Sequence, residues 1–412
     1  MAQRRLLMIT YHFPPSSAVG GHRLLGFCRH LPRLGWSCSI VAPPGLPWEA
    51  SDPELCKRVP AETTVHRVAF PTGPLWKPWR RAAGYASWIP LAWPTIRRVI
   101  REHRPDAVLT SGPPHVVHLL GVCLKRRHDV PWVADFRDPW VTDGTPNQGR
   151  SLTLRWQTFW ERSVMKRADT IVANAPLALK SIQEVYPQHA HKMVTITNGY
   201  DAESFPAVPH RAPNGLVTLL HAGEVSQGRD PRPLLDALQG LGQEQQGLAQ
   251  KLRVRFLGKV TPTDIAEGFN FPGELERRSL RDTVVVEGRV PYQRVLGDMS
   301  STDILLMLDT PGRRIGIPAK AYEYLGARRP ILALAERDGD VAWLLKESGI
   351  PHRIAPPREP ARIRQALLEL VKDVRAGQVA LPDKEKLAPF TRERLAQRLA
   401  QVLNNCIHHK LN

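Results

Sequence analysis

Charged side chains follow a β-rich run at residues 132–136, a place where functional groups of parallel sheets often gather. The sequence WVADFRDPW puts Asp135 at the end of that run and Arg137 and Asp138 directly after it. Because a proline follows Asp138, that residue disfavours helix, and we expect its carboxylate in a loop. We take Arg137 and Asp138 as candidate catalytic residues. A purely structural ion pair within this segment is the competing interpretation.

His115 is the third candidate catalytic residue. It belongs to the segment SGPPH, which follows another β-rich run at residues 107–111, with His118 three positions later. A histidine there can position a substrate hydroxyl or form a pair with Ser111, although no GxSxG elbow surrounds that serine. An ordinary histidine near a helix start fits the spacing equally well.

A glycine pair follows the first β-rich run. After LLMIT and a Pro-Pro turn, Gly20 and Gly21 lead into a helical pattern over residues 20–34. Backbone amides without side chains, at the positive end of a helix, can approach an anion. The pair is therefore a candidate for binding an anion, although a flexible loop before a helix is the alternative.

The second half of the chain offers a basic residue after a β-rich run at residues 217–222 and a polar helix start near residue 319. Arg229 is suited to phosphate binding because its guanidinium can donate two hydrogen bonds. In the segment GIPAKAYEYL, Gly316 precedes Lys320 and Glu323, which share a helix face. Lysine can meet a phosphate and glutamate can accept from ribose hydroxyls. A surface ion pair is the alternative.

The segment 76–104 combines tryptophans with basic residues. Trp76, Trp79, Trp88 and Trp93 lie among arginines and lysines with one acid. This composition fits a membrane–water interface rich in anionic lipid. Tryptophans that enter the protein core, or a platform that stacks single-stranded nucleic acid, are the two alternatives.

Strand and helix patterns alternate along the whole chain, which predicts an α/β protein with parallel sheets covered on both faces. Residues 206–214 contain three prolines and predict a linker. We therefore expect a first doubly wound, Rossmann-like domain over 1–205 and a second over 206–390. A terminal amphipathic helix, 391–412, packs on its own domain or crosses back to the first. Two such domains predict a cleft at the carboxyl ends of their strands.

Composition limits the class of protein. The chain has 412 residues, 42% hydrophobic and 23% charged, which is a globular composition. Five scattered cysteines predict neither a disulfide framework nor a zinc site, and we interpret the DGD sequence at residues 338–340 as a solvated turn. No apolar run is long enough to span a membrane, and the first residues do not form a signal peptide, so we expect a cytoplasmic protein. The net charge of +18 favours phosphorylated small molecules, anionic lipid or nucleic acid as partners.

Taken in order, the segments resemble the GT-B glycosyltransferases of the family 4 type. The similarity spans nearly the whole chain and is carried by LLMITYHFPP with GG, SGPPH, DFRDPW, ADTIVAN with ITNGYD, HAGEVSQGRDP and KAYEYL. The resemblance implies a nucleotide-sugar held mainly by the second domain, with no cofactor besides this co-substrate and no protein-bound metal. Its diphosphate would meet Arg229, Lys320 and the Gly20 and Gly21 amides, and its ribose would meet Glu323.

The chain departs from the family's pattern at two positions. Glu224 stands where the family has an arginine after the glycine, and Ile315 stands where the first glutamate of the family's E-x7-E motif is expected. The resemblance implies retaining transfer in which domain closure excludes water. We expect the acceptor to be a lipid-linked saccharide of envelope polysaccharide biosynthesis, with the protein resting on the inner membrane surface. The alternatives are a GT-B-like protein that has lost catalysis and a basic nucleic-acid-binding protein.

Overall fold

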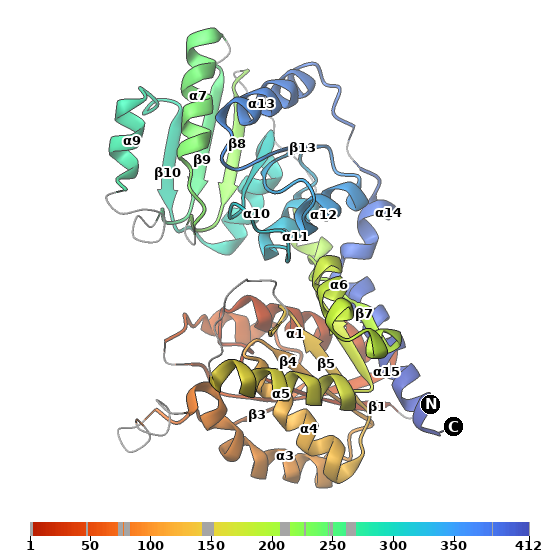
Figure 1. Cartoon of the computed structure of the whole chain (residues 1–412). Helices are drawn as coiled ribbons and strands as arrows, with labels where there is room; N and C mark the ends of the chain where they lie inside the picture. Colours follow the sequence, from red (N-terminus) through yellow and green to blue (C-terminus); the bar gives the residue numbers. More distant parts are fainter. Residues whose placement is uncertain are drawn as a thin grey trace. The chain divides into compact units, whose positions relative to one another are not determined.

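The computed structural model describes residues 3–46, 48–72, 77, 83–141, 152–206, 215–225, 228–245, 247, 250–260, 269–380 and 382–411. The chain divides into two compact units (Figure 1). Unit 1 comprises Met1–Gly199 and Arg392–Asn412, and unit 2 comprises Tyr200–Thr391. The expected domain boundaries were 205/206 and 390/391. Most of the expected linker, residues 207–214, lies outside the described residues.

Unit 1 contains a seven-stranded parallel sheet in the order β3-β2-β1-β4-β5-β6-β7. Its chain order reverses between β1 and β4, where a doubly wound sheet forms its binding crevice. The strands are β1 (Arg4–Thr10), β2 (Trp36–Ala42), β3 (Thr64–Arg67), β4 (Ala107–Gly112), β5 (Trp132–Phe136), β6 (Thr170–Ala173) and β7 (Met193–Thr195).

Helices cover both faces of this sheet. Along β1, Leu6 and Met8 alternate with Leu7 and Ile9, and all four are buried, so neither face meets solvent. The terminal helix α15 packs beside α1, and both contribute to one core with the strands. The helices of unit 1 are α1 (Val19–His30), α3 (Ile89–His103), α4 (His118–His128), α5 (Leu152–Arg167), α6 (Pro176–Val185) and α15 (Arg392–Leu411).

Unit 2 repeats the arrangement with a six-stranded parallel sheet, β10-β9-β8-β11-β12-β13, whose chain order reverses between β8 and β11. Its strands are β8 (Val217–Ala222), β9 (Leu252–Leu257), β10 (Val284–Gly288), β11 (Ile304–Leu308), β12 (Ile331–Leu334) and β13 (His352–Ala355). Its helices are α7 (Arg232–Glu244), α9 (Phe271–Arg277), α10 (Tyr292–Ser301), α11 (Ala319–Ala327), α12 (Asp340–Ser348), α13 (Pro360–Arg375) and α14 (Lys384–Leu387). Two doubly wound α/β units confirm the predicted fold class.

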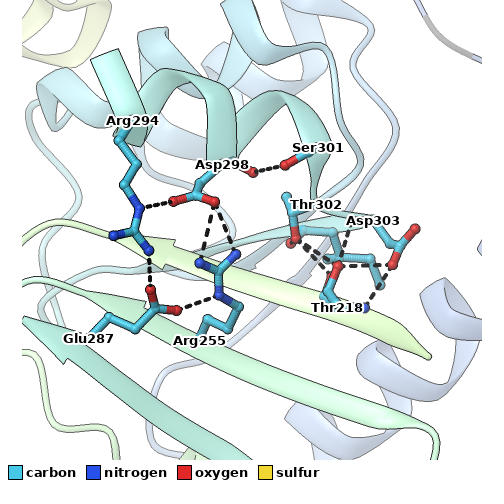
Figure 2. Close-up of polar contacts among 9 residues, drawn as sticks. Thr218, Arg255, Glu287, Arg294, Asp298, Ser301, Thr302 and Asp303 are labelled. Carbon is cyan, nitrogen blue, oxygen red and sulfur yellow. Dashed lines mark hydrogen bonds and ion pairs between the residues drawn. The ribbon is translucent and has the colours of Figure 1, made fainter. Parts of the chain in front are cut away.

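A polar network fixes α10 on this sheet (Figure 2). Arg255 on β9 donates to Glu287 on β10 at 2.6 Å and to Asp298 on α10 at 3.2 Å, and Arg294 on α10 donates to Glu287 at 2.8 Å. The hydrogen bond from Arg255 holds the pKa of the Glu287 carboxyl below its usual value. Arg255 thus ties β9, β10 and α10 together, and the first residue of α10, Tyr292, reaches the site described below.

Candidate active site

Lys320 and His221 form the buried centre of the candidate site in unit 2, beside the carboxyl ends of β8 and β11. His221 Nδ1 lies 3.0 Å from the carbonyl oxygen of Leu306, and His221 Nε2 lies 3.0 Å from Lys320 Nζ. Because Nδ1 must donate to the carbonyl, Nε2 is the acceptor for the ammonium. Burial, and then the charge of Lys320, hold the pKa of His221 well below its ordinary value. A neutral histidine therefore orients the lysine.

The pKa of the Lys320 amine lies close to neutral pH, so the amine can be charged or neutral. Burial lowers its pKa to about 7, and the charge of Arg229 acts in the same direction, against Asp309 and Glu323, which favour the ammonium. A Cβ at Gly223 would lie only 3.3 Å from Nζ, so the glycine at the end of β8 leaves room for the amine. An anion bound here would restore the charged form.

Arg229 and Asp309 act on the same amine, and Arg313 lies beside both of them. Arg313 Nη1 lies 3.3 Å from Asp309 Oδ1, and the guanidinium of Arg313 also lowers the pKa of Arg229, after burial. Burial raises the pKa of the Asp309 carboxyl. Within the described part of the chain, Arg229 Nε and Asp309 Oδ2 are buried without a hydrogen-bond partner. Buried polar atoms in that state are uncommon and are typical of a site that completes its hydrogen bonds with a ligand.

Two further candidate residues are Glu323 on α11 and Gly316 in the loop just before that helix. Glu323 accepts a hydrogen bond of 2.9 Å from the hydroxyl of Tyr292. Gly316 has a φ of 92° and donates its amide to Asp340 Oδ2 at 2.7 Å. The expectation of a solvated DGD turn is therefore wrong for Asp340, which is fully buried because it holds the backbone of the loop before α11. Asp338 is exposed and pairs with Arg314.

The two departures from the family pattern occupy defined places. Glu224, which replaces a cation, lies 3.6 Å from Arg289. The carbonyl of Ile315 accepts from Arg313 Nε at 3.3 Å. Arg313 thus brings a cation next to the position where the family's first glutamate is missing. Arg313 and His221 were not among the predicted site residues. The doublet Arg313-Arg314 before Gly316 is a sequence signal that could have pointed to Arg313.

Arg23, which was not among the predicted site residues, joins the buried polar groups of unit 1 through its hydrogen bonds. Arg23 on α1 forms a buried, two-pronged ion pair with Asp135 at 2.9 and 3.1 Å and donates to the carbonyls of Ile196 and Thr197. Ser111 Oγ donates to the same carboxylate at 2.7 Å. Asp135 is therefore the ion-pair partner of Arg23, which argues against the competing interpretation of an ion pair between Asp135 and Arg137. The Ser111 hydroxyl is occupied by its hydrogen bond to Asp135.

Arg137 lies against the first turn of α1. Its Nε donates to the carbonyl of Gly112 at 3.1 Å, and its Nη2 donates to the carbonyl of Pro113. A Cβ at Gly20 would fall 1.3 Å from Arg137 Nη1, so this glycine makes room for a guanidinium. A Cβ at Gly21 would meet the backbone of Phe13 at 3.4 Å. Burial lowers the pKa of Arg137 to about 10, which still leaves a cation at the helix N-terminus.

His115 and His118 are stacked, buried and neutral. Their ring centroids lie 5.7 Å apart, and His115 also stacks on Trp140. Burial lowers the pKa of His118 to about 3, and burial followed by the charge of His118 holds that of His115 well below its ordinary value. Among the described residues, His115 Nδ1 has no hydrogen-bond partner. Asp138 lies in an exposed loop, as predicted.

The structure brings the predicted site residues together in two groups. Arg229, Gly316, Lys320 and Glu323 gather at one edge of unit 2, and Gly20, Gly21, His115, Arg137 and Asp138 follow β1, β4 and β5 of unit 1. Over the described ranges, no three histidine, cysteine, aspartate or glutamate side chains are grouped so that they could hold a metal ion.

The membrane-facing interpretation of segment 76–104 is wrong for Trp88, which is fully buried and donates its indole N–H to the carbonyl of Val68 at 2.9 Å. Trp93 is half-buried beneath the guanidinium of Arg127. Trp76 and Trp79 lie outside the described residues. The search of the described helices finds none long and apolar enough to cross a membrane.

Comparison with known proteins finds similarity to glycosyltransferases. Residues 20–199 match the model of the glycosyl transferase 4-like domain. Two curated relatives agree: a probable glycosyltransferase, WbjE, of Pseudomonas aeruginosa, 21% identical over 67% of this chain and 68% of its own length, and a D-inositol 3-phosphate glycosyltransferase of Catenulispora acidiphila, 24% identical over 68% and 69%. The predicted resemblance is confirmed.

A solved structure shares the fold of this chain. Anabaena HepE in complex with UDP matches 97% of this chain and 100% of its own, with a TM-score of 0.65 and 14% identity. The similarity confirms the GT-B fold class that the two doubly wound units indicate.

Proposed function

We propose that this chain is a glycosyltransferase that transfers a sugar from a nucleotide-diphosphate sugar held by unit 2 to a lipid-linked saccharide acceptor of envelope polysaccharide biosynthesis. One observation carries the donor assignment. A buried lysine with its pKa near 7 lies beside an arginine whose Nε has no partner, at the point where the sheet order of unit 2 reverses. Buried like charges of this kind are costly unless an anionic ligand uses them.

The donor is the ligand that fits these side chains. Arg229, Arg313 and Lys320 supply three cations for the two phosphates, and Glu323 is placed to accept hydrogen bonds from ribose hydroxyls. Tyr292, held beside Glu323, orients the carboxylate. HepE binds UDP, which makes UDP and its sugars the first probes to use.

The mechanism we propose is retaining and uses protein cations in place of a bound metal ion. The acceptor hydroxyl attacks the anomeric carbon on the face from which the diphosphate leaves, and a leaving phosphate oxygen takes the hydroxyl proton. The bond from the anomeric carbon to the diphosphate breaks as the bond to the acceptor forms. Lys320 and Arg229 stabilise the charge that develops on the leaving group.

Unit 1 contributes the acceptor side in this proposal. Arg137, Asp138 and His115 follow adjacent strands, and a neutral His115 with an open Nδ1 can hydrogen-bond an acceptor hydroxyl. The net charge of +18 favours an acceptor at an anionic surface, and we propose a peripheral position on the inner face of the cell membrane. A GT-B protein that binds the donor but no longer turns it over is the second candidate, favoured by Glu224 and Ile315.

The test is the melting temperature of the full chain with a panel of nucleotides and nucleotide sugars. Ligand at about 100 times its dissociation constant stabilises the folded state by about 2.7 kcal/mol. We expect a shift with one nucleotide family that is lost in Arg229→Ala and in Glu323→Ala. The matched control is Arg375→Ala, an exposed arginine at the far end of α13, which keeps the shift.

Three outcomes would overturn parts of the proposal. The absence of a shift with every nucleotide would remove the donor site. Steep, salt-dependent binding of oligonucleotides without any nucleotide-sugar affinity would favour a nucleic-acid-binding protein. Donor binding without turnover, with membrane extract as acceptor, would favour the degenerate GT-B protein.

A further inference from the structure

Helix α5 of unit 1 exposes large apolar side chains on one face. Leu152 is 80% exposed, Phe159 is 60% exposed and Trp156 is 40% exposed. Their spacing of four and then three residues places them in one line along the helix, which we call the α5 stripe. Figure 1 shows α5 lying across unit 1, and its packing partner is α4. Soluble domains rarely leave such a line of side chains in water unless it binds something.

The opposite face of α5 is fixed in the protein. Val164 and Met165 are fully buried, and the buried Glu161 accepts from the hydroxyl of Tyr186 at 3.0 Å and from the amide of Val141 at 3.3 Å. Because these contacts set the rotation of the helix, the outward direction of the stripe is part of the fold.

Aromatic contacts keep the stripe in place. The ring of Trp160, beside the stripe, lies 6.2 Å from that of Trp156 and 5.3 Å from that of Phe159, in edge-to-face geometry. Pre-ordered aromatic side chains lose little conformational entropy when they are buried against a partner.

The exposed charges next to the stripe on α5 itself have one sign. The helix carries Arg155, Arg162 and Lys166 on its exposed surface, and its one acidic residue, Glu161, points into the protein. At 100° per residue these three cations form a column directly beside the stripe. A line of tryptophan, phenylalanine and leucine flanked by arginine and lysine is the composition of helices that lie in the interface of anionic membranes.

We propose that the α5 stripe and its three cations dock unit 1 on an anionic phospholipid surface. The charge pattern argues against a second copy of the chain as the occupant, because a two-fold contact through this face would bring like-charged columns together. The inference extends the proposed lipid-linked acceptor, since such an acceptor resides in a membrane. It also moves the membrane contact expected at segment 76–104 to another helix.

Cosedimentation with vesicles tests the proposal without any catalytic step. The full chain is mixed with vesicles of phosphatidylglycerol and phosphatidylcholine, or of phosphatidylcholine alone, at about 0.1 M salt. We expect binding to the anionic vesicles only. The double variant Trp156→Gln with Phe159→Gln should bind at least about tenfold more weakly, because it removes two interfacial aromatic side chains. Val185→Gln, an exposed apolar position on α6, is the control that keeps binding.

A charge variant separates docking from general attraction by the net charge of the protein. Arg155→Gln with Lys166→Gln should weaken binding about 30-fold, from about 1 kcal/mol per basic residue near the surface. Arg101→Gln with Arg126→Gln removes the same charge from exposed positions on α3 and α4 and should change binding much less.

Three results would overturn the proposal. The first is an equal loss of vesicle binding in the two charge variants. The second is unchanged vesicle binding in the aromatic variant. The third is a concentration-dependent dimer of the wild type that does not form in the aromatic variant. The nucleotide-dependent melting shift should persist in every one of these variants. Loss of vesicle binding with that shift intact concerns the membrane surface alone, whereas absence of the shift in the wild type concerns the proposed donor site.

Discussion

The pH dependence of donor binding follows from the state of Lys320. Its pKa of about 7 in the unliganded protein means that the amine is mostly neutral in weakly alkaline solution. Binding a diphosphate favours the ammonium, so the complex takes up a proton as it forms. Affinity for a nucleotide-diphosphate sugar should therefore fall as the pH rises above about 7 and level off below it.

The size of the effect follows from the charged fraction in the free protein. That fraction is about one half at pH ~7 and about 0.03 at pH ~8.5 for a pKa of about 7. If the bound lysine recovers its ordinary pKa, the affinity drops about 15-fold between these two conditions. Nucleotide sugars are better probes than free nucleotides, because they lack a terminal phosphate that titrates near neutrality.

The assay is isothermal titration calorimetry at the two pH values, in buffers of different ionisation enthalpy, so that proton uptake is measured directly. Lys320→Met should bind weakly with little dependence on pH. Arg229→Ala removes a neighbouring charge that lowers the pKa of Lys320, so its pH midpoint should move upward while its affinity falls. A wild-type affinity that stays flat over this range, or a Lys320→Met variant with the wild-type slope, would refute the reasoning.

Three further perturbations test the framework of the two units. Arg23→Ala leaves Asp135 buried without its cation and should lower the free energy of unfolding of unit 1 by about 3 to 5 kcal/mol in a denaturant titration; a loss below about 1 kcal/mol would contradict the assigned pair. Gly20→Ala places a methyl group where a guanidinium now lies, so its melting temperature should drop by several degrees, and an unchanged value would show that the guanidinium is free to move. Tyr292→Phe removes one hydrogen bond from Glu323 and should weaken nucleotide binding about three- to tenfold, with melting unchanged, whereas wild-type affinity would argue against an orienting role.

The central strands of both sheets could be predicted because they are continuous apolar runs. The expected runs 132–136 and 217–222 coincide with β5 and β8. The edge strands β3 and β13 escaped prediction. Their sequences, TVHR at residues 64–67 and HRIA at residues 352–355, are short and partly polar because one side of an edge strand has no neighbour.

The polar site was harder to predict because its members come from distant parts of the chain. Arg23 is one arginine in an ordinary helix, and only the register of β1, β4 and β5 brings Asp135 and Ser111 to it. His221 ends an apolar strand, and nothing local shows that Lys320, 99 residues later, donates to it. Spacing along the chain identifies strand ends, but a contact between two strand ends depends on the strand order of the sheet.

The most direct test of the central claim is a crystal structure of the full chain with the nucleotide sugar that gives the largest melting shift. We expect the diphosphate to lie within hydrogen-bond distance of Lys320 Nζ and the Arg229 guanidinium, and the Glu323 carboxylate to accept hydrogen bonds from the ribose hydroxyls. A nucleotide bound elsewhere in unit 2, or only in unit 1, would contradict it.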